Sequence, residues 1–163
     1  MDKQIKADRA WHIPFQIKEI LDSFDIDVLA GVSLQKYKKI FNEHKLHRFN
    51  DVHAEIFHDA VKKIANDYEG NVSCIWKRKP SSAKVVYEFL KFNGCGVKIA
   101  SMIANILVRD FGVEFSDYCS IDISPDIHVI KVMQRSGLIY EEVLLMYIPM
   151  IRVISVLRQE YRV

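Results

Sequence analysis

The stretch that decides the fold reads Phe92-Asn93-Gly94-Cys95-Gly96-Val97-Lys98-Ile99-Ala100. Apolar residues at helical spacing come before it and after it, so the pattern predicts two helices joined by a Gly-x-Gly hairpin. Two glycines one residue apart allow backbone angles that a side chain would forbid, and they let the main chain approach a ligand closely.

The start of the second helix is a candidate anion site. The first N–H groups of a helix have no partner inside it, and the helix dipole makes that end positive. A phosphate can therefore bind there. Lys98 stands within the first turn, beside this position. The sequence predicts a backbone phosphate clamp with an amine next to it, as suits a nucleic-acid ligand.

The hairpin resembles the helix-hairpin-helix of the DNA glycosylases related to endonuclease III. The family pattern is apolar-x-Gly-x-Gly-x-Lys-x-Ala, and every fixed position is met. A second family block, which begins Asp-x-His-Val, is similar to Asp126-Ile127-His128-Val129-Ile130-Lys131-Val132 and the following Gln134-Arg135-Ser136-Gly137-Leu138. Two blocks in the right order are far more specific than a lone Gly-x-Gly. The resemblance covers about residues 81–138.

The resemblance implies a DNA glycosylase with AP lyase activity in base-excision repair, with an oxidised base as the first expectation. Lys98 matches the family nucleophile, which attacks the sugar carbon C1′ and forms a Schiff base. Asp126 matches the carboxylate that stabilises the cationic sugar. The DNA phosphate would contact the hairpin at Gly94, Cys95, Gly96 and Val97. Gln4 is the candidate wedge that fills the gap left by the flipped base.

Other interpretations of these residues stay open. Lys98 could be a solvated lysine, and Asp126 could simply cap its helix. Asp122 is a rival acid four residues upstream. The spacing from Lys98 to Asp126 is longer than in close bacterial relatives, although archaeal-type 8-oxoguanine glycosylases also have longer spacings. The alternative functions are a non-catalytic helix-hairpin-helix protein that binds duplex DNA through phosphates, and an inactive relative that binds a partner.

The composition suits one domain over residues 1–163, with half of the residues hydrophobic. The net charge is only +2, so DNA would have to be held by a local basic patch. Candidates are Lys77-Arg78-Lys79 beside Trp76, and Lys91 with Lys98. The first of these could equally be a solvated loop.

Several features bear on cofactors and compartment. The three cysteines exclude a four-cysteine iron–sulfur cluster and fit reduced thiols in a cytoplasmic protein. The histidines form no compact metal-ligand set. We therefore expect no metal site and no cofactor. The family expectation adds a monovalent cation at hairpin carbonyls near Phe92, Cys95 and Val97. No apolar run is long enough to span a membrane, and the first residues lack a signal-peptide core.

Hydrophobic periodicity predicts a compact all-α fold without a sheet and with a groove beside the hairpin. The helix-hairpin-helix is expected at about residues 81–111. The predicted helices are Pro14–Phe24, Ser33–Glu43, Phe49–Tyr68, one starting at Ser81 or Ser82, Val97–Arg109, 124–136 and Glu141–Tyr161. Val113–Ile123 is expected to be irregular.

The predicted first helix is short for the family. If Gln4 matches the family glutamine, most of the first core helix is truncated. The apolar groove left by a missing helix could accept a second chain. The sequence therefore leaves the oligomeric state open, with a dimer among the alternatives.

Overall fold

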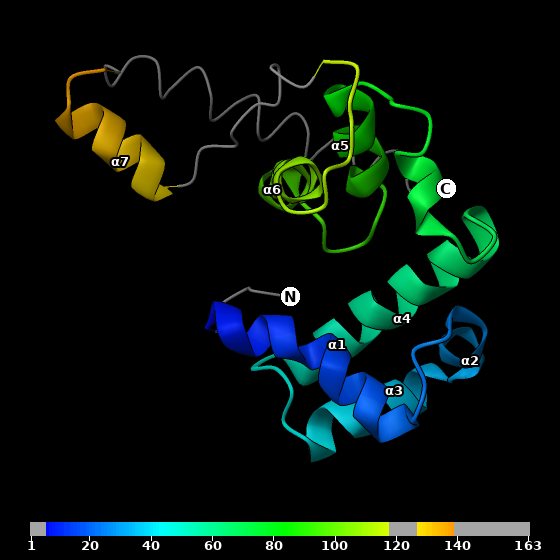
Figure 1. The fold of residues 1–163 in the computed structure, drawn as a ribbon. Coiled ribbons are helices and arrows are strands. Elements are labelled where there is room, and N and C mark those ends of the chain that lie inside the picture. The colour runs from blue at the N-terminus through cyan, green and yellow to red at the C-terminus, as the bar shows by residue number, and fades with distance from the viewer. Residues whose placement is uncertain (1–5, 118–126, 139–163) are drawn as a thin grey trace, which may run out of the picture. The chain divides into compact units, whose positions relative to one another are not determined.

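Helices form the secondary structure of the described residues, 6–117 and 127–138, in this computed structural model, and no strand occurs among them (Figure 1). The prediction of an all-α fold is therefore confirmed for this part of the chain. The chain is divided into two compact units, residues 1–122 and residues 123–163. A single domain over the whole chain stays a prediction.

The first unit carries six α-helices and one 3-10 helix among its described residues. They are α1 Ala7–Leu21, α2 Ile26–Gly31, α3 Leu34–Glu43, α4 Asn50–Asp67, η1 Val72–Ile75, α5 Ser82–Leu90 and α6 Val97–Arg109. The second unit carries α7 Ile127–Arg135.

The first hydrophobic core lies among α1, α2, α3 and the first half of α4. Ile13, Ile17, Tyr37 and Phe41 are completely buried there. The Tyr37 hydroxyl donates to the Leu29 carbonyl over 2.8 Å, so the buried phenol is satisfied. Burial raises the pKa of Tyr37 to about 12. This core holds the N-terminal helices together.

The second core holds the hairpin helices. Val85 of α5 and Ala100 and Ala104 of α6 are completely buried. Small alanines let helices approach closely, and α5 and α6 pack against each other. Helix α4 serves both cores, because Phe57 and Val61 belong to the first, whereas Ala60, Ile64 and Tyr68 pack against the second. This long helix therefore joins the two halves of the first unit (Figure 1).

Most predicted helix ends are confirmed by local hydrogen bonds. Ser33 and Ser81 cap α3 and α5, each accepting a backbone N–H at 3.3 Å, from Lys36 and Lys84. Helix α4 ends where Gly70, at φ 75°, donates to the Ile64 carbonyl. Helix α6 has the predicted bounds. Residues 113–117 are irregular, as predicted, and the remainder of that stretch lies outside the described residues.

The N-terminal helix differs from the prediction. Helix α1 begins at Ala7, well before Pro14, and ends at Leu21, where Asp22 adopts a left-handed φ of 52°. The buried stripe Ala10, Ile13 and Ile17 continues across the proline, and this packing outweighs the hydrogen bond that proline cannot make. The short elements α2 and η1 were not predicted, because a segment of this length is too short to show a clear hydrophobic period.

The C-terminal predictions are covered only in part. Helix α7 ends at Arg135, close to the predicted end at residue 136. Residues 124–126, where the prediction starts that helix, and the predicted helix Glu141–Tyr161 lie outside the described residues. Among the helices that the structure describes, none has the length and apolar character to cross a membrane.

Candidate nucleic-acid interface at the hairpin

The connection between α5 and α6 is a tight turn held by backbone hydrogen bonds. The Phe92 N–H donates to the Phe89 carbonyl, and the Cys95 N–H donates to the Phe92 carbonyl, both over 3.1 Å. Phe92 and Cys95 are buried in the second core. The turn is therefore anchored at two points, and Asn93 and Gly94 between them keep exposed surface.

Gly94 is required by the fold itself. Its φ is 76°, in the left-handed region that side chains disfavour. A Cβ added there would also lie 2.8 Å from Cδ1 of Ile56 on α4. Both backbone strain and the close approach of α4 therefore favour glycine at this position.

Gly96 has a different role from Gly94. Its φ is −90°, which any residue adopts, and an added Cβ would meet nothing within 4 Å. The expectation that both glycines supply forbidden backbone angles therefore holds only for Gly94. The missing side chain at Gly96 instead leaves open space beside the main chain, at the residue where α6 begins.

The first turn of α6 has no side-chain cap at its N-cap residue. Its first backbone hydrogen bond runs from the Ala100 N–H to the Gly96 carbonyl, over 2.9 Å. Amides that precede this bond have no partner inside the helix, which suits an anion. The Cys95 N–H is bonded to the Phe92 carbonyl, so the candidate first-turn amides are those that follow Gly96. A contact of Cys95 with a DNA phosphate stays a prediction.

The structure brings part of the predicted site together. Lys98 is exposed in the first turn of α6, next to Val97, which is also exposed. The hairpin residues Gly94, Cys95, Gly96 and Val97 adjoin it on the same segment. Asp126, its rival Asp122 and the candidate wedge Gln4 lie outside the described residues, as does the side chain of His128.

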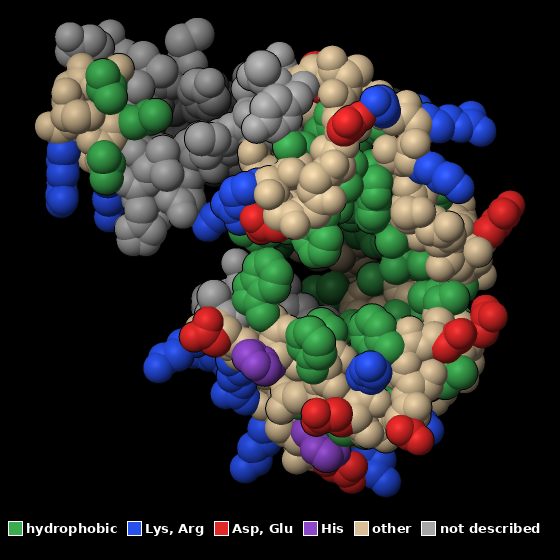
Figure 2. All heavy atoms as spheres, in the orientation of Figure 1, with side chains coloured by type: hydrophobic (Ala, Val, Ile, Leu, Met, Phe, Trp, Pro, Cys, Tyr) green, Lys and Arg blue, Asp and Glu red, His purple; other side chains and the backbone are tan. Residues whose placement is uncertain are grey.

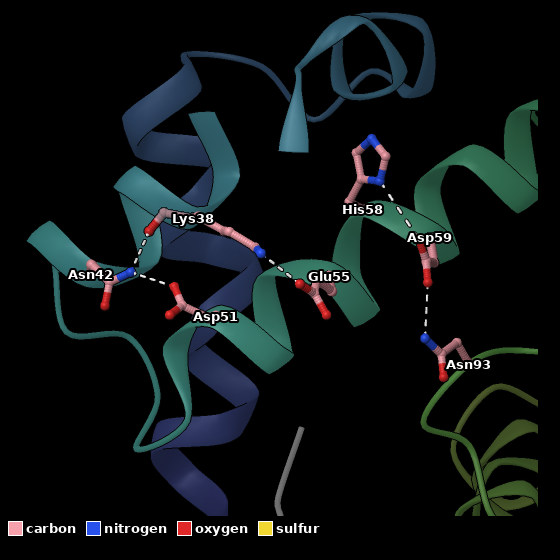
Figure 3. A network of polar contacts seen from close by, with 7 residues as sticks. All are labelled: Lys38, Asn42, Asp51, Glu55, His58, Asp59 and Asn93. Atoms are coloured by element: carbon pink, nitrogen blue, oxygen red, sulfur yellow. Dashed lines mark hydrogen bonds and ion pairs between the residues drawn. The ribbon is translucent and has the colours of Figure 1, made fainter. Parts of the chain in front are cut away.

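Helix α4 supports the hairpin through a polar contact that the sequence did not reveal. The Asn93 side-chain amide donates to Oδ2 of Asp59 over 2.9 Å, and Figure 3 shows the two side chains pointing toward each other. The same face of α4 is tied to α3 by Asn42 to Asp51 at 2.7 Å and by Lys38 to Glu55 at 2.5 Å. The contact between Asn93 and Asp59 holds the turn against α4, and the other two hold α3 against the same helix.

A second polar cluster fixes the end of α5 beside the hairpin. Glu88 accepts from the Tyr68 hydroxyl at 3.0 Å and from the Lys91 amine at 2.8 Å. The Tyr68 ring stacks on Phe92, with centroids 5.8 Å apart. Because Lys91 is paired with Glu88, its positive charge is partly neutralised. In the predicted basic patch of Lys91 and Lys98, Lys91 therefore attracts a phosphate less strongly.

The same cluster shifts two pKa values. Burial raises the pKa of Tyr68, and the bond to Glu88 adds to this. Burial alone would raise the pKa of Glu88, but the hydrogen bonds from Lys91 and Tyr68 outweigh it and leave that pKa below its ordinary value. A carboxylate with a depressed pKa stabilises the folded state above its unfolded pKa, and this contribution is lost as pH falls.

We therefore expect Glu88→Gln to lower the free energy of unfolding by about 1 kcal/mol at neutral pH, because charge-assisted hydrogen bonds are lost. The difference should start to shrink below about pH 4.3, where the unfolded chain takes up the proton first, and it should be lost once the pH falls below the lower folded-state pKa of Glu88. Urea unfolding between pH 3 and pH 7 measures both effects. Glu43→Gln is the control, since exposed Glu43 makes only a 3.7 Å contact with Lys39. A difference that stays constant with pH would contradict the prediction.

The predicted basic patch at Lys77-Arg78-Lys79 lies away from the hairpin turn. Lys77 and Lys79 line a hollow with Phe111 and Gly112, which follow the C-terminal end of α6. Helix α6 has 13 residues. At a rise of about 1.5 Å per residue it separates this hollow from the turn by roughly 20 Å. The patch is therefore a separate surface and not part of the phosphate clamp.

A groove beside the hairpin is visible as a hollow in the first unit. Figure 2 shows hydrophobic side chains lining it, between the part that carries α5 and α6 and the part that carries α1 to α3. Large apolar residues are exposed on these elements, among them Trp11 and Phe15 of α1 and Met102 of α6. Within the described ranges no group of three or more metal-binding side chains occurs.

Comparison of the chain with known proteins found no matching family model, no matching curated protein and no matching solved structure. The glycosylase resemblance therefore rests on the two sequence blocks, at residues 92–100 and 126–138. What the described residues add is a hairpin with an open, uncapped helix start and an exposed lysine in its first turn.

Proposed function

We propose that this chain is a DNA glycosylase with AP lyase activity in base-excision repair, and that it removes an oxidised base through a Schiff base at Lys98. The observation that carries the proposal is the position of Lys98. Its side chain is exposed in the first turn of α6, two residues after Gly96, where the main chain is open.

The hairpin supplies a place for the DNA backbone. The N-cap residue of α6, Gly96, makes no side-chain cap bond, and a phosphate at this helix start would be stabilised by the helix dipole. Gly96 has no side chain to keep the phosphate away. With a phosphate held there, the sugar next to it lies within reach of a lysine in the same turn.

The reaction follows from amine chemistry. The neutral Lys98 amine attacks C1′, the bond between C1′ and the base breaks, and the base leaves with the bonding electrons and takes up a proton. Loss of a proton from nitrogen and opening of the sugar ring give the Schiff base. Removal of a C2′ proton then expels the 3′ phosphate by β-elimination, which is the AP lyase step.

Two further roles come from the family resemblance. Asp126 would stabilise the positive charge that develops on the sugar, as a carboxylate placed beside a cationic transition state does. Gln4 would occupy the gap in the duplex once the damaged base is flipped out. The partner is accordingly double-stranded DNA that contains a damaged base or an abasic site.

The alternative is a non-catalytic clamp that binds duplex DNA through phosphates. The same observation favours it, since an uncapped α6 and an open Gly96 bind a phosphate without any amine chemistry. The two functions differ in one property: only the glycosylase forms a covalent bond to DNA.

The test is borohydride trapping of the full chain on duplexes that contain an abasic site, 8-oxoguanine or an oxidised pyrimidine. We expect a covalent protein–DNA band on the abasic duplex and on at least one damaged duplex. Absence of any band, with duplex binding that weakens steeply with salt, would replace the glycosylase by the clamp. Absence of both band and binding would overturn both functions.

A further inference from the structure

A hollow of about 400 Å³ lies at the C-terminal end of α6, away from the hairpin turn. Its lining combines aromatic, cationic and turn residues from two parts of the chain. They include Trp76, Lys77, Lys79, Phe111, Gly112 and Glu114. The phosphate clamp and the lysine chemistry proposed above use none of them.

The aromatic residues of this hollow differ in how they are held. Trp76 is partly buried and stacks on Phe89, with ring centroids 6.3 Å apart and planes 22° apart. Phe111 is 73% exposed, immediately after α6. Covering this ring with the apolar face of a ligand would be favourable. The site therefore has one fixed aromatic ring and one uncovered ring.

Two residues at the rim of this hollow, Gly112 and Lys79, have positive φ angles. Gly112, at φ 63°, ends α6 by donating to the Val108 carbonyl, and the chain then turns back. Glu114 reaches Lys79 and forms an ion pair with it. Lys79 itself has a left-handed φ of 45°, which is rare for a residue with a side chain and rarer still before a proline.

The charge of the hollow suits an anion. Lys77, Arg78 and Lys79 are consecutive and exposed, and Glu114 offsets only part of their charge. Aromatic rings beside lysines are the combination that binds single-stranded nucleic acid, where bases stack on the rings and phosphates meet the cations. Duplex DNA offers its bases only at their edges, so exposed ring faces favour an unpaired strand.

We propose that this hollow binds single-stranded nucleic acid, with an unpaired base stacked on Trp76 or Phe111 and the flanking phosphates at Lys77 and Lys79. The site is independent of the glycosylase proposal, because it lies at the other end of α6 from Lys98. A chain whose hairpin binds nothing would still have it.

The experiment uses tryptophan fluorescence of the full chain. The chain has two tryptophans, and Trp11→Phe leaves Trp76 as the only one. Titration with a short oligothymidylate should quench the Trp76 emission, since a stacked base quenches an indole. An oligonucleotide of the same length made entirely of tetrahydrofuran abasic analogues carries the charge without the bases and without an aldehyde that Lys98 could attack. It should quench far less.

Variants in the same background locate the site. Phe111→Ala should raise the Kd by about 10-fold, the order expected for one lost stacking partner. Lys77→Gln combined with Lys79→Gln should weaken binding and reduce the salt slope by about 1.4, at roughly 0.7 for each phosphate contact. Lys36→Gln with Lys39→Gln removes the same charge from exposed positions on α3 and should leave Kd almost unchanged.

Several outcomes would overturn the proposal. The first is that oligothymidylate does not quench Trp76, and the second is that the abasic strand quenches it as much as oligothymidylate does. The third is that the α3 control pair changes the Kd as much as the Lys77 and Lys79 pair. A thermal unfolding scan of each variant shows that the fold is intact, and the exposure of Phe111 makes this the expected result. Lys98→Gln should leave the quenching unchanged, so failure at the hairpin and failure at this hollow are distinguishable.

Discussion

Lys98→Gln is expected to reduce the borohydride-trapped band below detection while changing duplex affinity by no more than about fivefold. Glutamine cannot form a Schiff base, so the covalent step is lost entirely. The proposed phosphate clamp would remain, because it uses backbone amides of α6 and the open space at Gly96. Only one cation is removed, and the salt slope of binding should fall by about 1.

Two matched variants separate the loss of the Lys98 nucleophile from the loss of its positive charge. Lys98→Arg keeps the positive charge but remains protonated, so it should bind DNA like the parent and still give no band. Lys84→Gln removes an exposed first-turn lysine from α5, where Ser81 caps the helix. That variant should trap DNA as the parent does. A band that persists in Lys98→Gln would mean that another amine is the nucleophile.

Gly94→Ala is expected to lower the free energy of unfolding by about 2–3 kcal/mol. A left-handed backbone with a side chain costs about 1–2 kcal/mol. The added Cβ also lies 2.8 Å from Cδ1 of Ile56, and such overpacking costs about 1 kcal/mol or more. Urea unfolding followed by circular dichroism measures the loss.

Gly96→Ala is the matched control and should give the opposite pattern. Its φ of −90° accepts alanine, and the new Cβ meets nothing. Stability should stay the same or rise by up to about 1 kcal/mol, because the unfolded chain loses freedom. Duplex affinity should fall instead, because the methyl group occupies the space through which a phosphate would approach. Equal loss of stability in the two variants would contradict the assignment of distinct roles.

A double-mutant cycle tests the steric part of the Gly94 argument. Ile56→Val removes Cδ1, the nearest atom to the added Cβ. In the Ile56→Val background, Gly94→Ala should therefore cost about 1 kcal/mol less than in the parent. An unchanged cost would exclude Cδ1 as the source and assign the effect to the backbone angle and to Cγ1 and Cγ2, each 3.1 Å from the added Cβ.

Most helix bounds could be predicted because their signals are local. Ser33 and Ser81 cap helices by bonding to amides three residues ahead, and Gly70 ends α4 through a bond to Ile64, six residues back. The bounds of α6 followed from its apolar period and its flanking glycines. The predicted start of α1 at Pro14 was wrong. Proline is typical of the first turn of a helix, but here the buried stripe of Ala10, Ile13 and Ile17 continues the helix through it.

By itself, the sequence determined the helical class, the hairpin between two apolar helices and the place of Lys98 in a first turn, because each depends on neighbours within a few residues. Tertiary structure alone decided that the space beside Gly94 is filled, since Ile56 of α4 fills it, whereas the space beside Gly96 is open. It also decided that Asp59 supports Asn93, 34 residues away, and that Lys77 and Lys79 lie with Phe111 rather than with the hairpin. Such contacts join residues far apart in the chain, so no local period or spacing in the sequence predicts them.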